Sequence, residues 1–321
     1  MIFKNNPGVF IINYDTGIWE GPLDSDFMDL SKELPWLNIC TSSIERTWKG
    51  LDVHTWSYNH YYIVFIASII YILLIYFGPK IMRYRNAIKL DGLLRYWNLS
   101  LAIFSIIGSI KMFIYLITIN LHYGFITSIC TPAFISLTKG PTGLWLTLFI
   151  YSKYAELVDT LFIILRKKPL TFLHWFHHLT VLLYTWDAYT STQTIGVYFC
   201  TINYIVHSIM YYYYYLTSSG KKPSWGILIT ILQISQMIIG IFITIYGLYY
   251  SHYYPFPNIF PVTYLSQPLK VGCHFNKSNG ILACLMYISY LILFFDFFIK
   301  KYVTKETPLI EWVTANKKKN D

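Results

Sequence analysis

Long apolar runs repeat along this chain, and they limit what it can fold into more than any other feature of the sequence. Each run is about 20 residues long, the length that an α-helix needs to cross roughly 30 Å of hydrocarbon. Only 13% of the residues are charged, whereas soluble domains carry roughly 25%. The sequence therefore predicts an all-α polytopic membrane protein with seven transmembrane helices. We place them at 60–79, 99–122, 144–165, 171–189, 194–216, 225–250 and 281–300.

The basic residues between the predicted helices indicate how the chain is oriented. They concentrate in residues 80–95, 166–168, 221–222 and 300–319, which seven consecutive spans place on one side of the membrane. Cytoplasmic loops of membrane proteins carry the excess of Lys and Arg. We therefore expect the C-terminus in the cytoplasm and the N-terminus in the lumen.

Three regions follow from this topology. We expect a luminal, irregular head over 1–57, a seven-helix membrane domain over 58–303 and a cytoplasmic basic tail over 304–321. Lys318 and Lys319 stand near the end of the tail, in the positions of a dilysine retrieval signal. The alternative is a merely solvated basic tail. The retrieval reading predicts residence in the endoplasmic-reticulum membrane.

The five cysteines are too few for a disulfide scaffold, but two of them are placed where they could form a disulfide bond. Cys130 and Cys273 both fall in predicted luminal loops, on the oxidising side of the membrane. We predict a disulfide between them, with Cys40 of the head as the competing partner.

Charged side chains interrupt the third predicted span. Lys153, Glu156 and Thr160 share one helical face, and Asp159 flanks it. Charges inside a membrane span are costly and usually face a cavity or one another. These residues could form a buried ion pair that only fixes packing, or part of a functional site.

The fourth predicted span carries three histidines on one patch. His174, His177 and His178 stand at i, i+3 and i+4, which share a helical face. A single membrane histidine commonly makes a helix–helix hydrogen bond. Three together favour chemistry, because imidazole accepts and returns protons near neutral pH.

The next two spans continue the polar pattern. In the fifth, the stripe consists of Asn203, His207, Met210, Tyr211 and Tyr214; in the sixth, of Thr230, Gln233 and Gln236. The glutamines alone could be helix–helix contacts, and some tyrosines belong to an interfacial belt. The polar stripes of these four consecutive spans lie between the cytoplasmic side and the middle of the membrane, and they predict one shared cavity, open towards the cytoplasm.

At these residues the chain resembles the ELO-type family of very-long-chain fatty-acid elongases. The resemblance rests on Lys-x-x-Glu-x-x-Asp-Thr at 153–160, His-x-x-His-His at 174–178, Asn-x-x-x-His-x-x-Met-Tyr at 203–211 and Thr-x-x-Gln-x-x-Gln at 230–236. It implies seven helices, six of which form an inverted 3+3 barrel around a narrow acyl tunnel. It also implies condensation of acyl-CoA with malonyl-CoA to 3-oxoacyl-CoA, CO2 and CoA, without a metal or redox cofactor. The reductases and dehydratase of the elongation cycle are the implied partners.

The residue types fit this chemistry. Cysteine, the usual condensing nucleophile, is absent from the four stripes, so histidine remains as the candidate. Our hypothesis is that His177 takes the acyl group as an acyl-imidazole, supported by His207. His174 and His178 would orient it, move protons or polarise the thioester carbonyl. The binding or orienting residues would be Lys153, Glu156, Asp159, Thr160, Asn203, Met210, Tyr211, Tyr214, Gln233 and Gln236.

Basic residues of the cytoplasmic loops could meet the phosphates of CoA. The candidates are Arg166, Lys167, Lys168, Lys221 and Lys222. The alternative is that they only enforce the topology.

Two other functions compete with this reading. A membrane di-iron desaturase or hydroxylase also carries His-x-x-His-His, but it needs about eight histidines at cytoplasmic helix ends. His54, His60, His122, His252 and His274 lie on or near the predicted luminal side, which leaves four. A transporter would use the polar stripes as a substrate path. Nothing indicates nucleic-acid binding, because there is neither a basic aromatic groove nor zinc-finger spacing.

Overall fold

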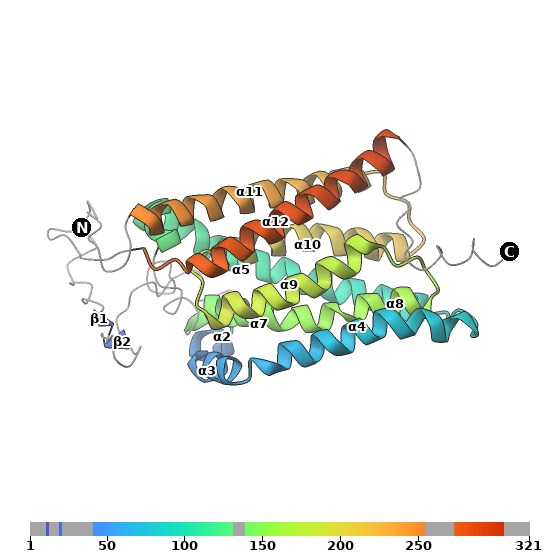
Figure 1. The fold of residues 1–321 in the computed structure, drawn as a ribbon, viewed down its shortest axis with the longest axis horizontal. Coiled ribbons are helices and arrows are strands. Elements are labelled where there is room, and N and C mark those ends of the chain that lie inside the picture. Colours follow the sequence, from blue (N-terminus) through green and yellow to red (C-terminus); the bar gives the residue numbers. More distant parts are fainter. Residues whose placement is uncertain (1–10, 13–18, 21–40, 131–138, 254–272, 305–321) are drawn as a thin grey trace.

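The computed structural model describes residues 11–12, 19–20, 41–130, 139–253 and 273–304 as an elongated bundle of helices (Figure 1). The helices are α2 (Ser43–Thr47), α3 (Leu51–Asn59), α4 (Tyr62–Arg83), α5 (Asp91–Cys130), α7 (Gly140–Glu156), α8 (Val158–Leu165), α9 (Phe172–Thr190), α10 (Gly196–Ser218), α11 (Gly226–Tyr253), α12 (Lys277–Phe298) and the π-helix η2 (Ile299–Val303). A two-residue antiparallel pair, β1 (Ile11–Ile12) and β2 (Trp19–Glu20), precedes them. Each predicted span coincides with a helix or, for the third span, with α7 and α8 together.

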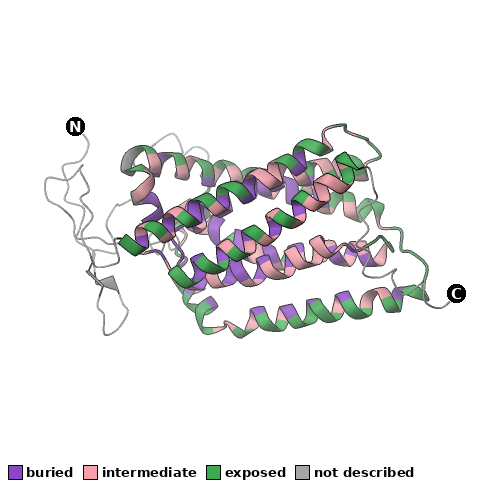
Figure 2. Ribbon diagram, turned by 45° about the horizontal axis from the view of Figure 1, so that its top comes forward, coloured by how far each residue is buried: buried purple, intermediate pink, exposed green. Residues whose placement is uncertain are grey.

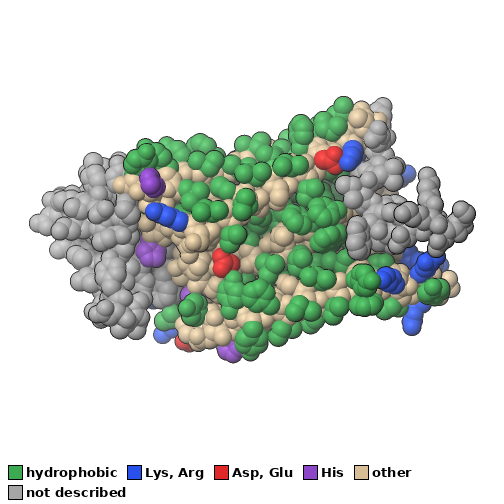
Figure 3. All heavy atoms as spheres, in the orientation of Figure 1, with side chains coloured by type: hydrophobic (Ala, Val, Ile, Leu, Met, Phe, Trp, Pro, Cys, Tyr) green, Lys and Arg blue, Asp and Glu red, His purple; other side chains and the backbone are tan. Residues whose placement is uncertain are grey.

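Four of the described helices are long and apolar enough to cross a membrane. They are α4, residues 91–121 of α5, α11, and α12 together with η2. Their outer faces are apolar: Ile70, Ile245 and Ile292 are more than half exposed. Figure 2 shows these exposed faces outside and buried residues inside, and Figure 3 shows hydrophobic atoms over much of the visible surface. The chain is therefore a membrane protein. The crossing of the remaining helices and the 3+3 barrel stay predictions.

The most extensive contact between helices joins α5 to α10. The two helices are antiparallel: Asn120 near the end of α5 accepts a hydrogen bond from Tyr198 near the start of α10. Midway, Gly108 leaves room for the ring of Tyr204, which a Cβ atom there would approach to 2.6 Å. This close packing fixes α10, and with it His207, against α5.

Two breaks interrupt the helical segments. At Leu157 the chain makes i→i−3 hydrogen bonds, from Leu157 N to Tyr154 O and from Thr160 N to Leu157 O, and these separate α7 from α8. The third span is therefore not one regular helix. In α5 the helical conformation is interrupted by a kink at Gly124. Its φ of 78° lies in a backbone region that favours glycine.

The expectation of an irregular head over 1–57 is wrong for residues 43–47 and 51–57, which lie in α2 and α3. Ser42 and Glu45 form a capping box at the start of α2, which satisfies backbone donors of its first turn. The same Glu45 carboxylate accepts a hydrogen bond from Trp145 Nε1 at 2.7 Å and lies 3.0 Å from Lys111 Nζ. These contacts fasten α2 to both α7 and α5.

The end of the bundle that carries α2 and α3 is closed by covalent and polar links. The predicted disulfide between Cys130 and Cys273 is present and joins the end of α5 to the segment before α12; Cys40 lies outside the described residues. Nearby, Asp187 accepts hydrogen bonds from Tyr61 at 2.9 Å and from Asn279 at 2.8 Å. These bonds tie α9 to α4 and α12.

Candidate active site

One cavity of about 540 Å³ gathers side chains from all four sequence motifs. Residues of α8, α9, α10, α11 and α12 form most of its wall. The predicted residues in that wall are Asp159, His174, His177, His178, Asn203, His207, Met210, Tyr211, Tyr214, Thr230, Gln233 and Gln236. The shared cavity that the sequence predicts therefore exists.

The three histidines of α9 present neighbouring rings. The helix begins where Thr171 accepts a hydrogen bond from the backbone N–H of His174, which satisfies an otherwise unpaired donor. The ring centroids of His174 and His178, one turn apart, are separated by 4.4 Å, and those of His177 and His178 by 5.7 Å. The i, i+3, i+4 spacing thus produces the patch that it predicts.

His177 is held from the side of α12. Its ring centroid lies 4.7 Å from that of Tyr290, whose hydroxyl donates to the carbonyl oxygen of His177 at 3.2 Å. The Nδ1 atom of His177 is buried and has no hydrogen-bond partner among the described residues. Nε2 is then the nitrogen available to a substrate. Tyr290 belongs to no motif, and its position in an apolar run gives no sequence signal.

His207 contributes a fourth imidazole, from α10. The buried ring has its Nδ1 3.9 Å from Oε1 of Glu156, and its centroid lies 5.5 Å from that of Tyr211. His177 and His207 come from different helices, and both line the same cavity.

Lys153 and Glu156 lie behind the wall of the cavity. Lys153 Nζ donates to Glu156 Oε1 at 2.7 Å and to Oδ1 of Asn203, a wall residue, at 3.2 Å. Of the two alternatives that the sequence offers for these residues, binding or orienting, the position behind the wall fits orienting: Lys153 contacts Asn203 and Glu156 lies near His207, and both of these line the cavity. The motif spans the break at Leu157 between α7 and α8, and of its residues only Asp159 lines the cavity.

On the other side of the break, Asp159 reaches the wall and Thr160 stays behind it. Trp97 Nε1 donates to Oδ1 of Asp159 at 2.6 Å, and the Tyr211 hydroxyl donates to Oδ2 at 2.8 Å. Thr160 instead lies 2.9 Å from Nε2 of His174. Trp97 was not predicted, because a tryptophan at the start of an apolar run reads as an interfacial residue.

Three polar side chains of α11 complete the wall. Thr230, Gln233 and Gln236 repeat every three residues and line the cavity together. Gln233 Nε2 donates to Sδ of Met210 at 3.5 Å, a contact that joins α11 to α10. Amide groups beside imidazoles can donate hydrogen bonds to carbonyl oxygens.

The basic rim differs in part from the predicted one. Of the predicted phosphate-binding residues, Arg166 and Lys168 line the cavity. Lys301 of η2, which was not predicted, lines it as well. Arg166 also pairs with Asp91 at 2.7 Å.

The other predicted rim residues are not part of the wall. Lys167 donates to the backbone carbonyl of Arg85 at 3.0 Å, and Lys221 and Lys222 are exposed away from it. The predicted retrieval residues Lys318 and Lys319 lie outside the described residues.

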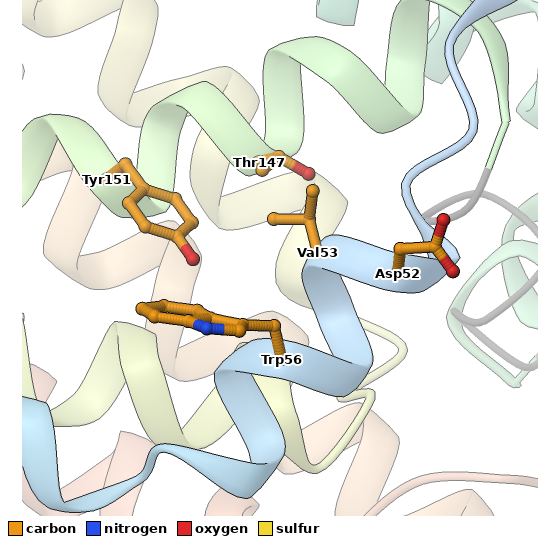
Figure 4. A pocket seen from close by; sticks show the side chains of 5 residues that line it. All are labelled: Asp52, Val53, Trp56, Thr147 and Tyr151. Atoms are coloured by element: carbon orange, nitrogen blue, oxygen red, sulfur yellow. The ribbon is translucent and has the colours of Figure 1, made fainter.

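A second hollow, of about 480 Å³, lies between α3 and α7. Figure 4 shows the ring of Tyr151 above the indole of Trp56, with Asp52 at the edge. Thr147 and Val53 complete it, and none of these residues belongs to the four motifs. The histidine cavity is therefore the candidate active site. Among the described residues, no group of three or more His, Cys, Asp or Glu side chains is arranged to hold a metal ion.

Comparison with known proteins identifies the family. Residues 56–309 match the model of the ELO family, described as the GNS1/SUR4 family. The chain belongs to the ELO family. Its sequence is 40% identical over 250 residues to very long chain fatty acid elongase 6 of Drosophila melanogaster, covering 77% of this chain and 74% of the relative.

Other relatives match to a similar extent. Putative fatty acid elongase 3 of Caenorhabditis elegans is 36% identical over 86% of this chain and 82% of its own length. The human very long chain fatty acid elongase 6 is 36% identical over 84% of this chain and 95% of its own length. The ELO-family match contains the whole cavity, whereas α2 and the first turn of α3 precede it.

Proposed function

We propose that this ELO-family protein is a 3-oxoacyl-CoA synthase, the condensing enzyme of fatty-acid elongation. The observation that carries the proposal is that His177 and His207, from α9 and α10, share one cavity with Asp159 and with the amides of α11. The names of the relatives, very long chain fatty acid elongases, support a role in fatty-acid elongation.

The first half-reaction loads the acyl group onto the protein. Nε2 of His177 attacks the carbonyl carbon of the acyl-CoA thioester, a C–N bond forms and the C–S bond breaks. The imidazole loses its ring proton, and the departing CoA thiolate takes up a proton. We assign the transfer of that proton to His207, which lines the same cavity as His177 and lies 3.9 Å from the Glu156 carboxylate.

The second half-reaction forms the new carbon–carbon bond. Malonyl-CoA loses CO2, and the electron pair that is released attacks the carbonyl carbon of the acyl-imidazole. The C–N bond breaks, and the departing imidazole takes up one proton, which returns His177 to its starting state. The sum is acyl-CoA, malonyl-CoA and one proton giving 3-oxoacyl-CoA, CO2 and CoA.

The surroundings of the histidines suit both steps. Hydrogen-bond donors from Gln233 and Gln236 face the same cavity, where they can stabilise an oxygen that gains negative charge. At the rim, Arg166, Lys168 and Lys301 can meet the phosphates of CoA. We place this rim at the cytoplasmic side of the endoplasmic-reticulum membrane, with a luminal N-terminus, in agreement with the basic loops.

The test is to look for the acyl-enzyme. Purified full-length protein is incubated with acyl-CoA alone and analysed by mass spectrometry. We expect an acyl adduct on His177 that is absent from His177→Ala. His252→Ala, which changes an exposed histidine outside the cavity, is the matched control and retains the adduct.

A second measurement tests the overall reaction. The protein receives radiolabelled malonyl-CoA and a panel of acyl-CoAs, and the released CO2 and the 3-oxoacyl product are quantified. Turnover without an adduct on His177, or with an adduct elsewhere, contradicts the acyl-imidazole. No malonyl-dependent turnover with any acyl-CoA contradicts the synthase activity. Stoichiometric iron in the purified protein would favour a desaturase or hydroxylase instead.

A further inference from the structure

Two hydroxyl groups connect α4 to His174. The hydroxyl oxygen of Tyr71 lies 2.7 Å from Oγ1 of Thr160, and Oγ1 lies 2.9 Å from Nε2 of His174. The exposed fraction is 1% for Tyr71 and zero for Thr160, so water does not compete for these bonds. Tyr71 belongs to none of the four motifs, and no described residue of α4 lines the cavity.

The number of hydrogens fixes the direction of this chain of bonds. Each hydroxyl carries one hydrogen. If Tyr71 donates to Thr160, the Thr160 hydrogen goes to Nε2 of His174, and the neutral ring keeps its own hydrogen on Nδ1.

Each other arrangement leaves a hydrogen without a partner among the described residues. If Tyr71 and His174 both donated to Thr160, the Thr160 hydrogen would have no acceptor. The second arrangement is the opposite direction. His174 would then donate from Nε2 to Thr160, and Thr160 to the oxygen of Tyr71. The phenolic hydrogen of Tyr71 would need another acceptor, and among the described residues its hydroxyl bonds only to Thr160. A buried hydroxyl hydrogen without an acceptor is energetically unfavourable. The favoured arrangement is therefore the one in which Tyr71 donates to Thr160 and Thr160 donates to Nε2 of His174.

We propose that Tyr71 is a positioning residue that, through Thr160, holds His174 in the tautomer with its hydrogen on Nδ1. His174 then serves the cavity as a hydrogen-bond donor and not as a base. The role of that donor rests on the proposed synthase function: it stabilises the carbonyl oxygen that becomes negative when the thioester or the acyl-imidazole is attacked.

His207 has a different environment and therefore a different task. Its Nδ1 faces a carboxylate oxygen of Glu156 at 3.9 Å. This negative charge favours the hydrogen on Nδ1 and leaves Nε2 of His207 as a proton acceptor. In the cavity, His174 therefore serves as a hydrogen-bond donor, and His207 serves as a base.

The tautomer can be observed without any assay of activity. In full-length protein labelled with 15N only in histidine, protonated and unprotonated ring nitrogens give separate NMR signals. The signals lost in His174→Gln belong to His174. We expect hydrogen on Nδ1 in the wild type and a mixture of tautomers in Tyr71→Phe. Hydrogen on Nε2 in the wild type would overturn the proposal.

Enzyme kinetics test whether the tautomer matters. Tyr71→Phe removes only the hydroxyl, and we expect kcat to fall about tenfold with an unchanged KM for acyl-CoA; removing an oxyanion donor outright costs roughly 100-fold or more. Tyr204→Phe is the matched control, because its equally buried hydroxyl donates to the carbonyl oxygen of Trp145, away from the histidines. An equal kcat for the two variants contradicts the proposal.

A double-mutant cycle separates positioning from general destabilisation. If Tyr71 acts through Thr160, Tyr71→Phe has no further effect on kcat in a Thr160→Val background, whereas Thr160→Ser keeps the relay and wild-type kcat. Additive losses from Tyr71→Phe and Thr160→Val would overturn the relay. If the wild type has no synthase activity but shows the Nδ1 tautomer, the proposed function fails and the assignment of the tautomer stands.

Discussion

Lys153 and Glu156 form an ion pair of 2.7 Å in which both side chains are almost completely buried. The pair stands one layer behind the cavity and contacts it on two sides, through Asn203 and through His207. Oε2 of Glu156 has no hydrogen-bond partner among the described residues. Opposite charges in this environment hold each other in place and fix the polar groups of the wall.

This pair gives a prediction for stability. Lys153→Met or Glu156→Gln leaves one buried charge without its partner, which costs about 3–5 kcal/mol. The double variant Lys153→Met/Glu156→Gln removes both charges, so we expect it to unfold at a higher temperature than either single variant. Thermal unfolding of the purified proteins in one detergent measures this. A double variant that loses the sum of the single effects would show that the two charges do not interact.

Two adjacent lysines of η2 provide a matched test of the rim. Lys301 lines the cavity, whereas Lys300 pairs with Asp296 at 2.8 Å. We expect Lys301→Ala to raise the KM for acyl-CoA about tenfold, the equivalent of one hydrogen bond to a charged group. Lys300→Ala should leave it unchanged. Equal KM values for the two variants would remove Lys301 from the binding site.

Two glycines of α5 test the packing of α5 against α10. At Gly108 an added Cβ would lie 2.6 Å from the ring of Tyr204, whereas at Gly92 it meets no atom within 4 Å. We expect Gly108→Ala to lower the free energy of unfolding by about 1–3 kcal/mol through overpacking. Gly92→Ala should be neutral or slightly stabilising, because alanine favours the helix. Chemical denaturation compares the two, and equal effects would contradict this account of the interface.

Glu45 makes the attachment of α2 dependent on pH. Burial by itself raises the pKa of Glu45, but hydrogen bonds from Trp145, Ser42 and Lys111 and the charge of Lys111 outweigh it, and the pKa lies below its usual 4.5. A carboxyl group whose pKa is lowered on folding stabilises the protein above its unfolded pKa. That stability is lost as the pH falls through the folded pKa.

The measurement is the melting temperature as a function of pH. We expect Glu45→Gln to reduce the fall of the melting temperature below about pH 4.5. Asp52→Asn, which changes an exposed carboxyl group on the neighbouring helix α3, should leave the wild-type curve intact. An unchanged curve for Glu45→Gln would show that the Glu45 contacts do not contribute to stability.

The helices and the main site residues could be predicted because both depend on local periodicity. The patch of His174, His177 and His178 follows from the helical repeat alone, and the apolar runs set the span lengths. Tyr71, which lies in an apolar run, could not be found this way. Tyr71 and Thr160 are 89 residues apart in the chain. A local sequence pattern cannot predict a contact between residues so far apart.

The break at Leu157 was also beyond the sequence pattern. An uninterrupted helix would keep Glu156 and Thr160 on one face, as their spacing predicts. In the structure a tightened turn separates the two residues, and Glu156 lies near His207 whereas Thr160 lies near His174. Sequence periodicity assumes a regular helix, so it cannot locate a change of register that neighbouring helices stabilise.

By itself, the sequence determined the membrane class, the places of the long apolar helices and the polar residues that avoid lipid, because apolar length and helical repeat are properties of contiguous residues. Only the tertiary structure decided which of these residues form the cavity wall, which stand behind it, and which groups from α4, α5, α12 and η2 join them. These choices depend on distances and burial between helices far apart in the chain.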